Sequence, residues 1–109
     1  MSTVSTHVLD TALGRPAAGI RVTLHRDGSL IGSSVTDDDG RVRDLLAHGS
    51  SLSEGDYYLT FSVANYFSDT KRAAFYNDIV IHFSIADDAQ HYHVPLLLSP
   101  FGYSTYRGS

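Results

Sequence analysis

Apolar and polar residues alternate with a period of two along most of this chain, and this alternation restricts the folds it can adopt. In residues 19–27, Ile20, Val22 and Leu24 fall on one face and polar side chains on the other. One apolar and one polar face is typical of a half-buried β-strand. The other alternating segments are residues 6–10, 29–36, 55–67, 78–85 and the tail from residue 91. The pattern predicts about seven or eight short strands.

The segments between these strands are short and contain one candidate helix. "DDDGR", from Asp37 to Arg41, has the composition of a turn, with a glycine where a positive φ is required. Residues 68–75 are predicted to form two helical turns, with Ser68 or Asp69 as the N-cap. Many short strands without intervening helices favour an all-β, two-sheet antiparallel sandwich over βαβ units. The length of 109 residues predicts one domain over 1–109.

The composition argues against several classes of protein. A net charge of −4 provides no basic surface for nucleic acid. The absence of cysteine excludes disulfides and thiolate metal sites. The apolar run Val94–Leu98 is too short to span a bilayer, and the first ten residues lack the features of a signal peptide. We therefore predict a cytoplasmic protein without nucleic-acid or membrane partners.

The tail has an unusual second face. His91, His93, Pro95 and Leu97 share that face, opposite a set of residues suited to a core. Pro95 cannot donate to a β-ladder, which favours an edge or irregular position for it. A strand with apolar residues on both faces needs a covering surface on each. We therefore expect this strand to lie at a contact between subunits.

Six histidines are present, and two of them form a pair. His25, His48 and His82 have no partner apparent from the sequence, so we assign them surface or structural roles. His91 and His93 lie two residues apart on one strand face, roughly 6–7 Å from each other. Such a pair is compatible with a zinc site if a third ligand is supplied from elsewhere, with acid–base catalysis, or with a structural role.

Motifs for covalent catalysis are absent from the sequence. There is no G-x-S-x-G elbow, no cysteine and no S-x-x-K, so any hydrolysis would use direct attack by water. The paired aspartates lie in predicted turns and favour a turn role over a glycosidase pair. Arg41 leaves the "DDDGR" turn, where its guanidinium could face a planar anion or simply be solvated.

Several motifs in this sequence together resemble one family. The tail "HVPLLLSPFGYSTYRGS", the amino-terminal "THVLDTALGRPA", "DDDGR" and "IVIHFSI" occur in the order found in the 5-hydroxyisourate hydrolases, or transthyretin-related proteins. The resemblance covers essentially the whole chain. It implies a transthyretin-like (prealbumin-like) sandwich with one short helix. It also implies ring opening of 5-hydroxyisourate, without a cofactor or metal, in a homotetramer (a dimer of dimers) whose sites lie between the dimers.

The resemblance also implies roles for individual residues. The catalytic set carried over by motif is His7, Arg41, His93 and Ser109, and the substrate-binding set is His7, Arg41, Tyr106 and Ser109. We expect His93 to be the base and His7 its hydrogen-bonded partner, with the assignment between the two histidines open. An arginine fork can stabilise the developing oxyanion.

Two other functions remain open at this point. One is a transthyretin-like carrier that binds a small molecule without turnover. The second histidine of H-Y-H and the R-G-S ending favour the enzyme over this carrier. The other is a zinc-dependent cyclic amidohydrolase that uses His7, His91 and His93. The resemblance does not place His91 among the catalytic residues.

Overall fold

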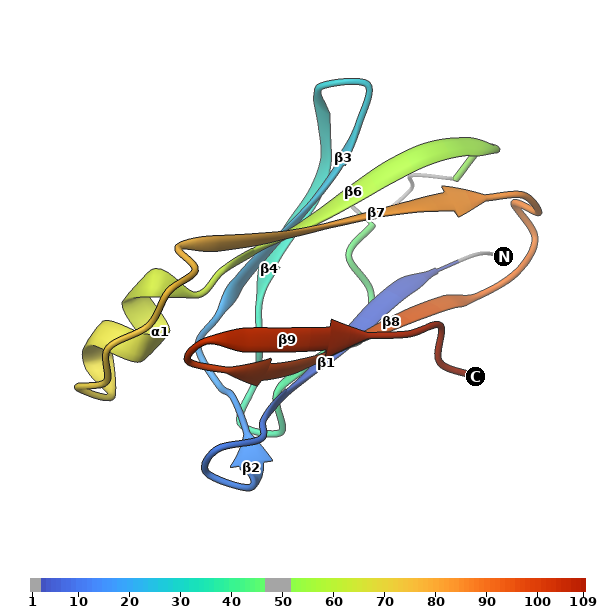
Figure 1. The fold of residues 1–109 in the computed structure, drawn as a ribbon. Coiled ribbons are helices and arrows are strands. Elements are labelled where there is room, and N and C mark those ends of the chain that lie inside the picture. The colour runs from blue at the N-terminus through green and yellow to red at the C-terminus, as the bar shows by residue number, and fades with distance from the viewer. Residues whose placement is uncertain (1–2, 47–51) are drawn as a thin grey trace.

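The computed structural model describes residues 3–46 and 52–109, which form two β-sheets and one short helix (Figure 1). The predicted two-sheet sandwich with one short helix is confirmed. The described elements are β1 (Val4–Asp10), β2 (Arg15–Pro16), β3 (Arg21–Arg26), β4 (Ser29–Val35), β5 (Arg41–Val42), β6 (Gly55–Ser62), α1 (Ala64–Asp69), β7 (Asp78–Ile85), β8 (Tyr92–Ser99) and β9 (Gly102–Thr105).

The first sheet contains the amino-terminal strand and the tail. Its order is β2-β1-β8-β9, and β5 also pairs with β1. Most of its pairs are antiparallel, as predicted, but β1 and β8 are parallel, with Ser5 opposite His93 and His7 opposite Pro95. This register places the H-x-H segment beside the start of the chain.

The second sheet is antiparallel, in the order β4-β3-β6-β7. The predicted alternation holds here, because Val22 and Leu24 of β3 are fully buried, as are Leu59 and Phe61 of β6. Residues from the inner faces of both sheets join one hydrophobic core cluster. The period of two therefore identified the buried faces correctly.

Pro95 does not lie in an edge strand, but it occupies an irregular position, the second of the two predicted alternatives. Its strand β8 is flanked by β1 and β9. The pairing of β8 with β9 begins at Leu96 opposite Thr105, and an isolated bridge then joins His93 to Gly108. The interruption falls at Pro95, which has no backbone N–H to donate. A proline is therefore accommodated inside the sheet at a gap in the ladder.

The helix α1 lies earlier in the chain than predicted. It spans Ala64–Asp69, whereas the sequence pattern placed it over 68–75. Val63 occupies the N-cap position without a side-chain capping bond. Phe67 is 2% exposed and packs in the core. Tertiary packing of this side chain, rather than a capping residue, explains the position of the helix.

Strand β6 is correspondingly shorter than the predicted alternation. It covers Gly55–Ser62 instead of 55–67. The backbone N–H groups of Val63 and Ala64 both donate to the carbonyl oxygen of Asn77, at 3.1 Å each. These bonds turn the chain out of the sheet immediately after the strand.

A buried carboxylate marks the far end of β1. Asp10 is completely buried, and it accepts hydrogen bonds from the Tyr66 hydroxyl at 2.7 Å and the Leu13 N–H at 3.0 Å. The Arg72 guanidinium donates to the same carboxylate at 2.5 Å. These contacts tie β1 to α1 and to the segment that follows it.

Within the described residues, no helix is long and apolar enough to cross a membrane.

Candidate active site

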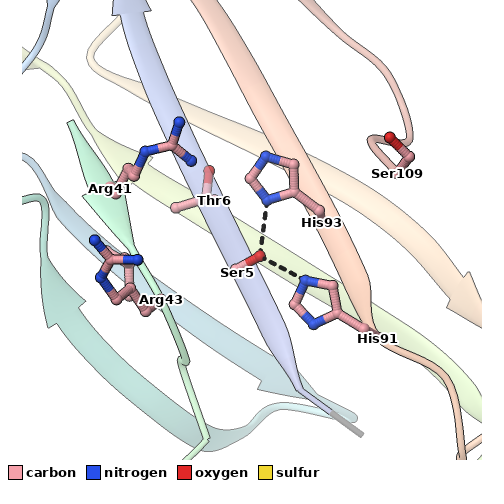
Figure 2. A pocket seen from close by; sticks show the side chains of 8 residues that line it. Ser5, Thr6, Arg41, Arg43, His91, His93 and Ser109 are labelled. Atoms are coloured by element: carbon pink, nitrogen blue, oxygen red, sulfur yellow. Dashed lines mark hydrogen bonds between the residues drawn. The ribbon is translucent and has the colours of Figure 1, made fainter. Parts of the chain in front are cut away.

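A polar cavity of about 270 Å³ lies on the outer face of the first sheet, beside β1 and β8 (Figure 2). Three strand segments and the end of the chain contribute to it. Its polar lining consists mainly of Ser5, Arg41, Arg43, His91, His93 and Ser109. Imidazole, guanidinium and hydroxyl groups therefore meet in one open site.

The parallel register of β1 and β8 determines the position of the histidines. Ser5 lies opposite His93, and its Oγ is 2.7 Å from His93 Nδ1. The same oxygen is 3.1 Å from His91 Nε2. The two rings are nearly parallel, with centroids 6.4 Å apart, as expected for residues i and i+2 on one strand face. Ser5 thus links both histidines through one hydroxyl.

His93 does not bond to His7, which the sequence analysis proposed as its partner. Ser5 is the described residue that bonds to the His93 imidazole. The register explains the difference, since His7 lies opposite Pro95, two residues further along β8. His7 nevertheless shares the outer face with Ser5, because the two are two residues apart on β1.

The turn before β5 fixes the position of Arg41. The Asp37 carboxylate accepts the backbone N–H of Arg41 at 2.9 Å. Gly40 has a φ of 76°, and a Cβ at this position would lie 2.4 Å from the Val8 carbonyl oxygen. Only glycine fits both constraints. The chain then enters β5 with Arg41 opposite His7, so both are on the face that carries the cavity.

The end of the chain closes against His93. The Gly108 N–H donates to the His93 carbonyl oxygen at 2.8 Å. A Cβ on Gly108 would lie 2.4 Å from His93 Cδ2, so a larger residue could not approach the ring without displacing it. This contact brings Ser109 to the rim of the cavity (Figure 2).

The surroundings of His93 favour its neutral form. Burial lowers the pKa of this imidazole below its ordinary value of 6.5, and electrostatic repulsion from Arg41, with contributions from His91 and His7, lowers it further. At neutral pH the ring is therefore uncharged and can accept a proton.

The structure brings together only part of the predicted site. Arg41, His93 and Ser109 line the cavity, and His7 lies on the same face without being among its lining residues. Tyr106 lines a second, more apolar cavity of about 160 Å³. A single chain therefore does not place Tyr106 beside His93.

Sequence reasoning missed Ser5, Thr6 and Arg43 as lining residues, and it left His91 outside the catalytic set. One signal for Ser5 was available. It precedes His7 by two residues, so any strand that presents His7 on a face also presents Ser5.

The other histidines have ordinary surroundings. His82 is on the second sheet, where its ring stacks on Tyr58 at 4.5 Å and its Nε2 lies 3.9 Å from an Asp56 carboxylate oxygen. His25 is partly buried in β3, and His48 lies outside the described residues. No group of three or more His, Cys, Asp or Glu side chains in the described part of the chain is arranged to hold a metal ion.

Two facing sheets, with one short helix between β6 and β7 and a polar cavity beside the tail, define a transthyretin-like sandwich. The match to the solved structure of sea bream transthyretin in complex with thyroxine has a TM-score of 0.87 and 26% identity, covering 97% of this chain and 94% of that one. Residues 4–108 match the model of the HIUase/Transthyretin family. The chain belongs to the HIUase/transthyretin family, which confirms the resemblance seen in its motifs.

Two similar proteins carry the name of the hydrolase branch. The chain is 48% identical to "5-hydroxyisourate hydrolase 2" of Rhizobium meliloti (strain 1021), over 97% of this chain and 95% of the relative. The solved structure of Klebsiella pneumoniae 5-hydroxyisourate hydrolase has a TM-score of 0.90 and 38% identity, covering 100% of this chain and 94% of that chain.

Proposed function

We propose that this protein hydrolyses 5-hydroxyisourate to 2-oxo-4-hydroxy-4-carboxy-5-ureidoimidazoline in urate degradation, at the cavity beside β1 and β8. The observation that carries this proposal is that His93, Arg41 and Ser109 meet in one polar cavity. The names of its similar hydrolases support the choice of substrate.

The reaction needs a base, a charge stabiliser and a proton donor. His93 takes a proton from a water molecule while the oxygen of that water attacks the ring carbonyl. A C–O bond forms, and an oxyanion develops on the carbonyl oxygen. Arg41 supplies a planar set of donors to that oxyanion. The C–N bond then breaks, its electron pair moves to nitrogen, and that nitrogen receives a proton. A neutral imidazole is suited to these transfers near pH 7.

His7, Tyr106 and Ser109 complete the proposed site. His7 lies beside Arg41, where it can orient substrate or donate a proton. Ser109 offers its hydroxyl at the cavity rim. Because Tyr106 faces the second cavity of its own chain, its contact with substrate would have to come from a neighbouring subunit's tail.

The proposed working form is a homotetramer, a dimer of dimers, with the cavity in the channel between the dimers. In the described residues, β7 and β9 each form one outer edge of their sheet, opposite β4 and β2. Val80, Phe101 and Tyr103 on or beside them are 52%, 70% and 42% exposed, so apolar side chains at these edges are available to a neighbouring subunit. Size-exclusion chromatography with light scattering tests the assembly.

A single domain over 1–109 and a cytoplasmic location also stay predictions.

The lining of the cavity favours hydrolysis over the two alternatives. A carrier for an apolar ligand gains little from an arginine and two histidines. A zinc amidohydrolase needs a third ligand, and the described residues provide no such group. Activity that survives extensive chelation would exclude the zinc alternative.

The decisive experiment follows freshly generated 5-hydroxyisourate by ultraviolet absorbance. The protein should accelerate the decay far above the spontaneous rate, with and without chelator. A decay rate unchanged by the protein would contradict the proposal. If the protein bound 5-hydroxyisourate without accelerating its decay, the carrier alternative would be favoured.

A second experiment tests the role of the tail. Deleting Tyr106–Ser109 removes Gly108 and Ser109 from His93 but no fully buried side chain, so the protein should stay folded and tetrameric with little hydrolase activity. Circular dichroism, light scattering and the absorbance assay measure the three properties. Normal turnover would show that the tail has no part in catalysis, and unfolding would show that it is structural.

A further inference from the structure

The Ser5 hydroxyl connects the candidate base to an exposed histidine. Ser5 is 7% exposed, and its oxygen bonds both His93 Nδ1 and His91 Nε2 (Figure 2). The other nitrogen of His91, Nδ1, bonds the Thr3 hydroxyl. His91 itself is exposed. A continuous chain of hydrogen bonds therefore runs along the cavity wall, from the partly buried His93 to the exposed His91.

The number of protons in this chain allows two ordered arrangements. A serine hydroxyl donates one hydrogen bond and can accept others, and a neutral imidazole donates from one nitrogen only. If Ser5 donates to His91, it accepts from His93 Nδ1, and His93 Nε2 is then a free base. If Ser5 donates to His93 instead, His93 Nε2 carries the proton and is an acid. One change of direction along the chain interconverts the two.

We propose that Ser5 and His91 form a proton relay that switches His93 from base to acid during a turnover. This inference rests on the proposed hydrolysis. Ser5 and His91 act through His93, so they are positioning residues rather than residues that touch substrate.

Each step of the relay balances. When water attacks, one of its O–H bonds breaks and the proton goes to His93 Nε2. The Nδ1 proton moves to Ser5, the Ser5 proton to His91 Nε2, and the His91 Nδ1 proton leaves through Thr3 or solvent. His93 is then neutral with a proton on Nε2. That proton goes to the departing ring nitrogen, and a proton that returns through His91 and Ser5 restores the first arrangement.

The charges around His93 give the relay a purpose. A doubly protonated His93 is disfavoured because the ring is partly buried beside positive groups. The relay removes the second proton, so this cation need not persist through the reaction. The charged and titratable side chains around His93 come from three elements. They are His7 of β1, Arg41 of β5 with Arg43 just after it, and His91 just before β8.

The test compares two variants that interrupt the relay with one variant that preserves it. Ser5→Ala removes the hydroxyl, His91→Asn removes the surface imidazole, and Ser5→Thr keeps a hydroxyl in the same place. Turnover is measured in weak buffer and with rising concentrations of imidazole. Both interrupting variants should lower kcat about tenfold, less than the 10²–10⁴ expected for loss of an acid–base group itself, with KM nearly unchanged. Imidazole should restore kcat, because it carries protons by diffusion, and Ser5→Thr should stay near wild type.

Several results would overturn the relay. A folded His91→Asn protein with wild-type kcat in weak buffer is one, and this variant changes only an exposed side chain. A loss that imidazole does not restore is another, because it would indicate a purely structural role. If the wild-type protein accelerates the decay but the variants give one of these contrary results, the relay is wrong and the hydrolase proposal stands. If the wild-type protein gives no acceleration, both are wrong.

Discussion

The two ends of strand β1 each carry a polar cluster, and the clusters differ in how their polar groups are used. At one end, Asp10 is fully buried and accepts hydrogen bonds from Leu13, Tyr66 and Arg72. At the other end, Ser5 connects two histidines that line an open cavity. The first cluster is centred on a carboxylate that solvent does not reach, and the second faces an open cavity.

The cluster around Asp10 is suited to stabilising the fold, and the cluster around His93 is suited to catalysis. Burial by itself would raise the pKa of Asp10, but hydrogen bonds from Arg72, Tyr66 and Leu13, with the guanidinium charge, hold it below its ordinary value. The carboxylate therefore stays charged and paired. His93 has the opposite character, because its surroundings keep it neutral. A group poised to change its protonation state is suited to catalysis, and one locked in a single state is suited to structure.

The largest expected effect is on the catalytic side of this comparison. His93→Asn keeps a polar side chain but removes the titrating group. Turnover should fall about 10²–10⁴-fold, the usual contribution of general acid–base catalysis, while folding is retained. The absorbance assay with circular dichroism measures both. His82→Asn is the matched control, because His82 lies on the second sheet, and it should keep normal activity. Near-normal turnover by folded His93→Asn would contradict the assignment.

Arg41 tests whether geometry or charge matters at the cavity. Arg41→Ala should lower kcat about 10²–10³-fold, as expected for the loss of an oxyanion donor. Arg41→Lys should recover little of this loss, because lysine lacks the planar fork. Steady-state kinetics measures the difference, with Arg21→Lys on the second sheet as a control. If lysine restores most of the activity, only positive charge was required.

Asp10→Asn tests the structural side. The substitution leaves the Arg72 guanidinium, whose side chain is 20% exposed, without its counter-charge. Unfolding free energy should fall by about 2–3 kcal/mol, near the low end for a broken buried ion pair because Arg72 is partly solvated. Urea unfolding measures it, with Asp56→Asn, whose side chain is 63% exposed, as the control. An unchanged midpoint would refute the structural role.

This stabilisation also has a defined pH dependence. The folded pKa of Asp10 is lower than that of an unfolded aspartate, which is about 3.9. Its contribution is therefore complete above about pH 4 and is lost as the pH falls through the folded pKa. The stability gap between wild type and Asp10→Asn should shrink in that acidic range.

The smallest expected effect is a shift in the pH dependence of the activity. Because the folded pKa of His93 is lowered, the base stays unprotonated to a lower pH than a free histidine would. The acidic limb of kcat/KM should therefore lie below about pH 6.5. A limb above that value would show that the surroundings of His93 do not act as described.

The sequence predicted the sheets better than it predicted the contacts between them. Alternation identified the buried faces of β3 and β6, because side-chain direction in a strand has a strict period of two. The helix was misplaced because Phe67 is anchored by core packing, which local capping signals do not report.

The site was predicted in part for a related reason. The family motifs carry His93, Arg41 and Ser109, and the structure brings these to one cavity. The role of Ser5 depends on the parallel register of β1 with β8, which joins residues 88 positions apart. The Asp10–Arg72 pair likewise joins residues 62 positions apart. Such pairings follow from tertiary structure, and a local pattern does not contain them.

One measurement tests the division between the two ends of β1 most directly. The decay of fresh 5-hydroxyisourate is followed with equal folded amounts of wild type, Asp10→Asn and His93→Asn, and the urea midpoint of each protein is determined in parallel. The account predicts that Asp10→Asn is less stable but turns over like wild type, whereas His93→Asn is comparably stable but nearly inactive. Full activity in His93→Asn, or equal loss of activity in the two variants, would contradict it.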